Sequence, residues 1–208
     1  EGEVEPGGQR HLGPPGHTPD PAHAVEIGGD ITPRPLFFLK SPSSVVQADA
    51  DGLAEFSLPN HEDLIHHEVE MVVRLGEDLN PTEVCIGIDV TNRTRQTEAK
   101  GKGWPWTEGK SFRDSAVLGT WAEWEAGEYE MQLSVNGEVC QHASSSQMVH
   151  DIDSLLTTLT DWYALSPGDL VFTGTPEGVG PMVAGDLVEA TLHAADGRLV
   201  SRLESTAR

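Results

Sequence analysis

Lysine is nearly missing from this chain of 208 residues, which has four lysines among 13 basic residues, against 34 acidic residues. The resulting net charge of −21 disfavours binding to nucleic acids or to anionic membranes, since both carry negative charge themselves. The acids form no run of five or six like charges, which an acidic interaction tail would require. An evenly acidic, lysine-poor surface keeps a protein hydrated in concentrated salt, so we expect a halophilic source.

Long apolar runs are missing as well. No stretch approaches the roughly 20 apolar residues that cross a bilayer, and the first ten residues, EGEVEPGGQR, lack the cationic and then apolar order of a signal peptide. We therefore expect a cytoplasmic protein. Cys85 and Cys140 fall in strand-like stretches without paired spacing, which argues against a disulfide or a cysteine-based metal site.

The organisation along the chain indicates one domain. Residues 1–22 are rich in glycine, proline and polar groups, so we expect a loose or truncated arm there. From Leu36 onward, short β-prone runs, the first of them LFFL, follow one another. This pattern predicts a mainly β domain with few helices, of the α+β class, over residues 23–208.

Two turn signals and one helix signal stand out. Asn136-Gly137 and Asp196-Gly197 are each flanked by alternating apolar residues, which predicts two antiparallel hairpins. Asp151 or Asp153 is a suitable N-cap, because apolar residues follow at helical spacing and Pro167-Gly168 comes after them. We expect this apolar stripe to pack in the core: Leu155, Leu156, Leu159, Trp162 and Tyr163.

Three acidic residues suggest a metal site. Glu68 and Glu70 alternate within the β-prone run of residues 65–73, so they would project from the same face of one strand. A Glu-x-Glu pair on a solvated strand face is commonplace in so acidic a chain. Asp89, however, stands between Ile88 and Val90, where an unpaired carboxylate would be costly to bury. Three hard oxygen donors favour Mg²⁺, Mn²⁺ or Ca²⁺ over zinc.

From about residue 23 to its end, the chain resembles the fumarylacetoacetate hydrolase family, close to its acylpyruvase and 2-hydroxyhepta-2,4-diene-1,7-dioate isomerase branch. The resemblance rests on several motifs in the family's order: PLFFLKSPSSVV, HHEVEMVV, DVTNR, WPWTEGKSF, SVNGEV and LSPGDLVFTGTPEGVGPMVAGD. It implies a mixed β-roll, a homodimer, a Mg²⁺ or Mn²⁺ cofactor bound by the three acids, and a small 2-oxo acid as substrate.

The resemblance also implies roles for four further residues. Lys110 matches the family lysine that contacts the substrate's oxyanion, and Arg93 and Gln96 match polar groups near the metal. Thr175 matches a threonine that binds the substrate carboxylate. Without the resemblance, Lys110 would be a surface lysine on a loop, and TGTPEGVG would be a tight turn without the GK[ST] ending of a phosphate loop. Arg113 stands where the family usually has Asp, which affects local ion pairing but no predicted ligand.

His23 and Glu26 have the i, i+3 spacing of one face of a helical turn. The family uses such a pair on a mobile lid, where histidine takes a proton from water and the carboxylate orients it. The family's Asn-Tyr pair just upstream is replaced here by HTPDPA, so an exposed pair in a flexible arm is the alternative.

Together, these motifs predict a divalent-metal-dependent enzyme that acts on 2-oxo acids or their enols. Hydrolysis of a C–C bond in an acylpyruvate-type substrate is the first expectation. Isomerisation of 2-hydroxyhepta-2,4-diene-1,7-dioate and decarboxylation of oxaloacetate use the same electron sink and remain alternatives. A relative that has lost catalysis and only binds a metal or a small acid is an alternative of another class.

Overall fold

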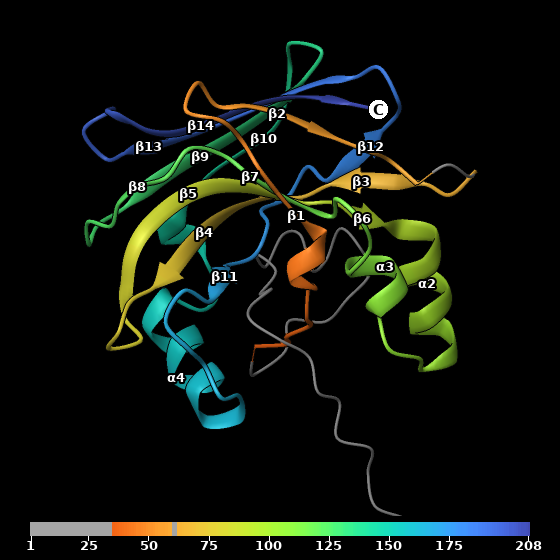
Figure 1. Ribbon diagram of the computed structural model, residues 1–208. Coiled ribbons are helices and arrows are strands. Elements are labelled where there is room, and N and C mark those ends of the chain that lie inside the picture. Colours follow the sequence, from red (N-terminus) through yellow and green to blue (C-terminus); the bar gives the residue numbers. More distant parts are fainter. Residues whose placement is uncertain (1–34, 60–61) are drawn as a thin grey trace, which may run out of the picture.

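The protein is represented by a computed structural model that describes residues 35–59 and 62–208 (Figure 1). The described part of the chain forms three β-sheets with a few short helices. The predicted class, mainly β with few helices, is confirmed. None of the helices in the described residues is long and apolar enough to cross a membrane.

The largest sheet has six strands in the order β1-β7-β5-β4-β11, and β8 pairs with β5 beside β7. β4 and β5 form its antiparallel centre. Five consecutive residues of β4, Val69 to Val73, are buried, so both faces of this strand are covered. The bounds are β1 (Val45–Gln47), β4 (Val69–Leu75), β5 (Pro81–Asp89), β7 (Ala116–Leu118), β8 (Ala122–Glu123) and β11 (Leu170–Phe172).

The second sheet has five strands in the order β10-β9-β13-β14-β2, and the third has three strands in the order β12-β3-β6. Figure 1 shows the five-stranded sheet lying across the curved β4 and β5 strands. The bounds are β2 (Leu53–Phe56), β9 (Tyr129–Val135), β10 (Glu138–Ser144), β13 (Leu187–Ala194) and β14 (Leu199–Ala207), then β3 (Ile65–His67), β6 (Thr91–Asn92) and β12 (Gly180–Met182).

The main core lies between the two larger sheets. Side chains of β4 and β5, such as Met71 and Ile86, join Leu133 of β9 and Leu192 of β13 in one buried cluster. Burial of apolar surface at roughly 25 cal/mol per Å² is the main favourable contribution here. The core therefore fixes β4 and β5 firmly, and these are the strands that position the predicted metal ligands.

Both predicted hairpins are confirmed. Asn136 and Gly137 have φ angles of 52° and 81°, as a two-residue turn between β9 and β10 requires. Gly197, with φ of 84°, lies in the turn between β13 and β14. Cys85, which is buried, and Cys140 are both free cysteines.

The predicted helix is α4 (Ile152–Trp162), and its N-cap is Asp151, whose side chain accepts a hydrogen bond from the Ser154 N–H. Leu155, Leu156 and Leu159 are buried as expected. The expectation for Trp162 was wrong, because its exposed fraction is 57% at the last position of the helix.

The expected strand at residues 36–39 is not formed; this segment forms no regular strand and lines a cavity instead. It is followed by the short 3₁₀ helix η1 (Pro42–Ser44), and a second one, η2 (Ser145–Gln147), follows β10. Two α-helices that no sequence signal indicated, α2 (Arg93–Lys102) and α3 (Thr107–Lys110), connect β6 to β7.

Candidate metal and substrate site

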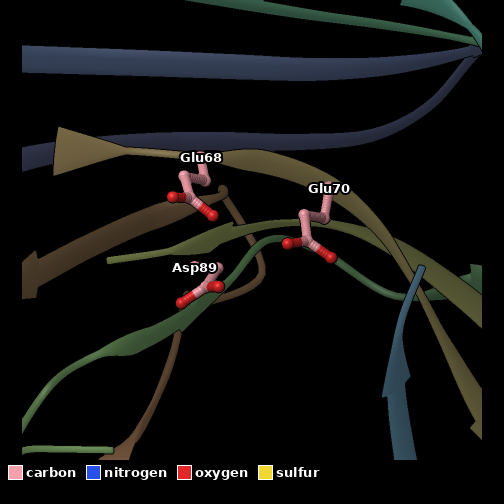
Figure 2. Close-up of side chains that lie close together, drawn as sticks. All are labelled: Glu68, Glu70 and Asp89. Carbon is pink, nitrogen blue, oxygen red and sulfur yellow. The ribbon is translucent and has the colours of Figure 1, made fainter. Parts of the chain in front are cut away.

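The three predicted ligands come together at one end of β4 and β5. Their carboxylate oxygens lie within 4.8 Å of one another, and the exposed fraction of each residue is 0%. Figure 2 shows the three side chains side by side on neighbouring segments. Glu70 lies on β4, Asp89 is the last residue of β5, and Glu68 directly precedes β4.

The prediction that Glu68 and Glu70 share one continuous strand needs a correction. The strand is interrupted at Glu68, where the chain leaves the small sheet containing β3 and enters the large sheet containing β4. The extended alternation continues through the break, because the Asp89 N–H donates to the Glu68 carbonyl at 2.8 Å. Both glutamates therefore still lie beside Asp89.

Lys110 is the fourth member of the cluster and is buried, not a surface loop residue. Its ammonium group donates to Glu68 Oε2 at 2.7 Å, to Asp89 Oδ2 at 2.6 Å and to Thr91 Oγ1 at 2.6 Å. Burial alone would lower the pKa of Lys110, but the carboxylates of Asp89 and Glu68 outweigh it and hold the pKa above the ordinary value. Lys110 is therefore protonated at neutral pH.

Arg93 and Gln96 lie beside the acidic cluster. Arg93 is the first residue of α2, and its Nη2 donates to Glu68 Oε1 at 2.5 Å. Its Nη1 donates to Gln96 Oε1 at 2.5 Å, which the i, i+3 spacing on the helix allows. Burial and then the charge of Arg93 lower the pKa of His66 to about 4, so His66 is neutral and can accept from the Arg93 guanidinium. These contacts fix the direction of the Arg93 side chain.

Thr175 is buried in the loop between β11 and β12. The preceding residue, Gly174, donates its N–H to Glu70 Oε2 at 2.6 Å, so the loop touches the acidic cluster directly. Gln141 of β10 donates to the Thr175 hydroxyl oxygen at 2.9 Å. The structure thus brings Thr175 into the same site as the three acids.

Lys40 belongs to the site although no sequence argument predicted it. Its Nζ lies 2.7 Å from Asp89 Oδ1 and donates to the carbonyl oxygens of Lys110 and Ser115. Burial lowers the pKa of Lys40, and the charge of Asp89 opposes that effect. The chain's scarcity of lysine was a usable signal: Lys40 and Lys110, two of only four lysines, are both in this site.

A cavity of about 650 Å³ adjoins the site. Lys40 lines this cavity and also pairs with Asp89, so this lysine connects the cavity wall to the acidic cluster. Much of its wall is aromatic, including Phe38, Trp104 and Trp106, and the Lys110 Nζ lies 4.9 Å from the centre of the Phe38 ring. The volume suits a small organic molecule.

The donor set fits a hard divalent cation. Three fully buried carboxylates converge, and oxygen is the donor that Mg²⁺ and Mn²⁺ prefer. Two other predicted residues, His23 and Glu26, lie outside the described residues, so their role stays a prediction.

The β-rich fold and the buried cluster of acids define a class of candidate metal-binding proteins, and comparison with known proteins identifies the family. Residues 20–204 match the family described as fumarylacetoacetate (FAA) hydrolase C-terminal, and the chain belongs to this family. Among curated relatives, a mitochondrial oxaloacetate tautomerase of Oryza sativa subsp. japonica is 34% identical over 183 residues, 81% of this chain and 79% of the relative. An oxaloacetate tautomerase of Escherichia coli K12 is 32% identical over 184 residues, 81% of this chain and 82% of the relative.

Solved structures of the family have the same fold. Fumarylpyruvate hydrolase from Pseudomonas aeruginosa in complex with Mn²⁺ and pyruvate has a TM-score of 0.80 at 30% identity, covering 90% of this chain and 85% of its own. 5-Carboxymethyl-2-hydroxymuconate delta-isomerase from Mycobacterium smegmatis has a TM-score of 0.75 at 28% identity, covering 92% of this chain and 76% of its own. The family therefore contains hydrolases, isomerases and tautomerases.

Proposed function

We propose that this protein is a Mg²⁺- or Mn²⁺-dependent enzyme that acts on a 2-oxo acid through its enolate. The observation that carries the proposal is the buried cluster of Glu68, Glu70 and Asp89 with the Lys110 ammonium group 2.6 to 2.7 Å from two of its carboxylates. The Mn²⁺ and pyruvate in the related fumarylpyruvate hydrolase support this choice of metal and substrate class.

A divalent cation held by Glu68, Glu70 and Asp89 would supply a Lewis acid for the oxygens of the 2-oxo acid. The Lys110 ammonium group, which lies beside Glu68 and Asp89, would donate a hydrogen bond to the oxygen that becomes negative as the enolate forms. Arg93, held by Glu68 and Gln96, adds a fixed positive charge. Thr175, in the loop between β11 and β12, would bind the substrate carboxylate.

Tautomerisation of oxaloacetate is the reaction that we place first. It needs only an enolate and proton transfers, and it is the activity in the names of curated relatives at 32% to 34% identity. Charge also favours a dicarboxylate. The three acids carry three negative charges, and the basic side chains that pair with Glu68 and Asp89 (Lys40, Arg93 and Lys110) carry three positive charges, so the two positive charges of a metal would be balanced by a dianion.

Hydrolysis of an acylpyruvate, the first expectation from the sequence, is the second candidate, because a structural relative is a fumarylpyruvate hydrolase. It needs an activated water, and we assign this task to His23 with Glu26 as its orienting partner. Isomerisation and decarboxylation of related dicarboxylates share the same enolate. As the resemblance implies, we further propose that the protein works as a homodimer.

The test compares three proteins, the parent, Lys110→Met and His23→Ala, each assayed with Mg²⁺ in high salt. Substrates are oxaloacetate, followed as keto–enol exchange and as decarboxylation, and acetylpyruvate, followed as pyruvate release. We expect Lys110→Met to lower the turnover of oxaloacetate and of acetylpyruvate by roughly 10²- to 10³-fold, since both reactions need the enolate oxygen stabilised. His23→Ala should lower hydrolysis by roughly 10²- to 10⁴-fold, the usual cost of losing a general base, and tautomerisation less.

Metal binding is the control for both variants. His23→Ala should bind Mn²⁺ like the parent, because His23 is not a predicted ligand. Lys110→Met should bind it at least as tightly, because removing a cation makes the cluster more negative. A Lys110→Met variant with parental rates would refute the proposed role of Lys110. A parent protein that binds Mn²⁺ but converts none of these substrates would instead indicate a binding protein without catalysis.

A further inference from the structure

Gln141 binds the loop between β11 and β12, which contains Thr175, and both the oxygen and the nitrogen of its side-chain amide have hydrogen-bond partners. The residue is 1% exposed and follows an irregularity in β10, where the register with β9 shifts between Val139 and Gln141. Its Oε1 lies 3.0 Å from the Val69 N and 2.9 Å from His67 Nδ1. Its Nε2 lies 2.9 Å from the Thr175 Oγ1 and 3.0 Å from the Pro176 carbonyl oxygen.

These partners fix the orientation of the amide. A backbone N–H can only donate and a backbone carbonyl can only accept, so the Gln141 oxygen must face Val69 and the nitrogen must face Pro176. His67 then carries its hydrogen on Nδ1, because the oxygen that it contacts can only accept. The two hydrogens of the Gln141 NH₂ group are committed to the Pro176 carbonyl and to the Thr175 hydroxyl oxygen.

The direction of the Thr175 hydroxyl follows from this arrangement. Because its oxygen accepts from Gln141, the hydroxyl cannot return its own hydrogen to that NH₂ group, which has no lone pair to offer. Within residues 35–59 and 62–208, no hydrogen bond donated by the Thr175 hydroxyl is found. Thr175 follows Gly174, whose N–H binds Glu70, so the hydroxyl hydrogen is available beside the acidic cluster.

We propose that Gln141 is a positioning residue: by donating to the Thr175 hydroxyl oxygen, it leaves the hydroxyl hydrogen free to donate to the carboxylate of the bound 2-oxo acid. This inference rests on the proposed function, in which Thr175 binds that carboxylate. A hydroxyl that presented a lone pair instead would repel the negatively charged group. Gln141 thus sets affinity for the substrate without contacting it.

Close packing keeps the loop on Gln141. Gly178, with φ of 89°, approaches β10 so closely that a Cβ atom there would lie 2.1 Å from the Cys140 carbonyl oxygen. A Cβ at Gly180 would lie 3.1 Å from His67 Nε2. The loop therefore packs against Cys140, which precedes Gln141 in β10, and β12 begins against His67, which contacts the Gln141 oxygen. The irregularity at Cys140 and the two glycines place the amide and the loop in register.

The test uses Gln141→Glu, whose carboxylate would accept from the Thr175 hydroxyl and so turn its hydrogen away from the substrate. Pyruvate affinity is measured by calorimetry on the Mn²⁺-loaded protein, alone and in a Thr175→Val background. We expect Gln141→Glu and Thr175→Val each to weaken pyruvate binding by about 10- to 100-fold, as for loss of a hydrogen bond to a charged group. The pyruvate affinity of the double variant should lie within about twofold of that of Thr175→Val alone.

Two controls separate this role from a structural one. Gln132→Glu makes the same charge change at an exposed position of β9 and should bind pyruvate like the parent. Mn²⁺ affinity, measured without pyruvate, should not fall in any variant, because the three acidic ligands are intact and Gln141→Glu only adds a negative charge near them. If Gln141→Glu does not fold, Gln141→Met replaces it in the same cycle, with the same expectation that its effect vanishes when Thr175 is valine.

Two results would overturn the inference alone: parental pyruvate affinity in Gln141→Glu, or the same loss of affinity in both backgrounds, which would indicate a general structural or charge effect. A parent protein that binds Mn²⁺ but not pyruvate would overturn the proposed function, and the inference with it.

Discussion

At the scale of single residues, the site is a cluster of buried charges that stabilise one another. Isolated buried carboxylates would be protonated or would destabilise the fold. Here Glu68 pairs with Arg93 and Lys110, and Asp89 pairs with Lys40 and Lys110. Glu70 instead accepts the Gly174 N–H. The amide oxygen of a glutamine at position 70 could accept the same N–H, which makes Glu70 a suitable position for a test.

We predict that Glu70→Gln weakens Mg²⁺ and Mn²⁺ binding strongly while the fold remains intact. The amide oxygen can still accept the Gly174 N–H, and the substitution also removes repulsion from Glu68 and Asp89, so stability should not fall. Calorimetric titration with each ion gives the affinity, and thermal melting in EDTA gives the stability. Glu138→Gln, at an exposed position of β10, removes one negative charge elsewhere and controls for a general electrostatic effect. Unchanged ion affinity in Glu70→Gln would remove Glu70 from the ligand set.

Individual residues of the site differ in how far the sequence could predict them. Glu70 and Asp89 were predictable because carboxylates within apolar strands need a partner. The scarcity of lysine is a signal for Lys40, but it does not reveal the role of this residue, which depends on contacts with Asp89 and Lys110, 49 and 70 positions away in the chain. Gln141 was not predictable: an uncharged side chain inside a β-prone run gives no local signal, and its importance comes from the loop that packs against it.

At the scale of elements, the helices α2 and α3 carry Arg93, Gln96 and Lys110, and their contact aligns these side chains. Sequence periodicity did not indicate α2, because the helix has too few apolar residues to form a stripe. Its two buried residues are Gln96 and Ala99. The strands and hairpins, in contrast, were predicted well because alternation and Asn-Gly turns are local signals. The helices α2 and α3 lack such local signals, so they were identified only from the structure.

Gly109 is the contact point between the two helices. A Cβ atom at this position would lie 2.9 Å from both the Cβ and the backbone nitrogen of Gln96, and backbone atoms cannot easily move away. We predict that Gly109→Ala displaces α3, and Lys110 with it, and destabilises the protein by roughly 1–3 kcal/mol, as is usual for overpacking. Turnover should fall more than Mn²⁺ affinity, because Lys110 moves while the three acids remain.

Gly101→Ala is the matched control for this prediction. Gly101 lies in α2, and a Cβ atom placed there would meet no described atom within 4 Å apart from its chain neighbours and the adjacent helix backbone. Alanine is a better helix residue than glycine by roughly 0.5–1 kcal/mol, so this variant should melt at a slightly higher temperature with parental turnover. If Gly109→Ala behaves like Gly101→Ala, the contact between α2 and α3 does not position Lys110.

At the scale of the whole molecule, the large negative charge affects the stability of the folded state. The net charge of −21 is spread over a chain with 34 acidic and 13 basic residues, and three of the basic ones are used inside the site. Three acidic residues are used there too, so the rest of the chain has 31 acidic and 10 basic residues and still carries the whole net charge of −21. Repulsion among these carboxylates opposes the compact state.

We predict that the melting temperature rises markedly from dilute buffer to concentrated KCl. Salt shortens the Debye length from about 10 Å at 0.1 M to about 3 Å at 1 M, so repulsion between neighbouring surface acids is screened. For a chain of this size, each kcal/mol of added stability raises the melting temperature by roughly 2–4 °C. The triple variant Glu123→Gln, Glu128→Gln and Glu204→Gln, at exposed positions, should show a smaller rise, because fewer charges need screening. Sucrose, which stabilises without screening, should raise the melting temperature of the parent and the variant equally. A melting temperature that does not respond to KCl would rule out adaptation to high salt, and an equal response in the triple variant would show that surface charge is not its cause.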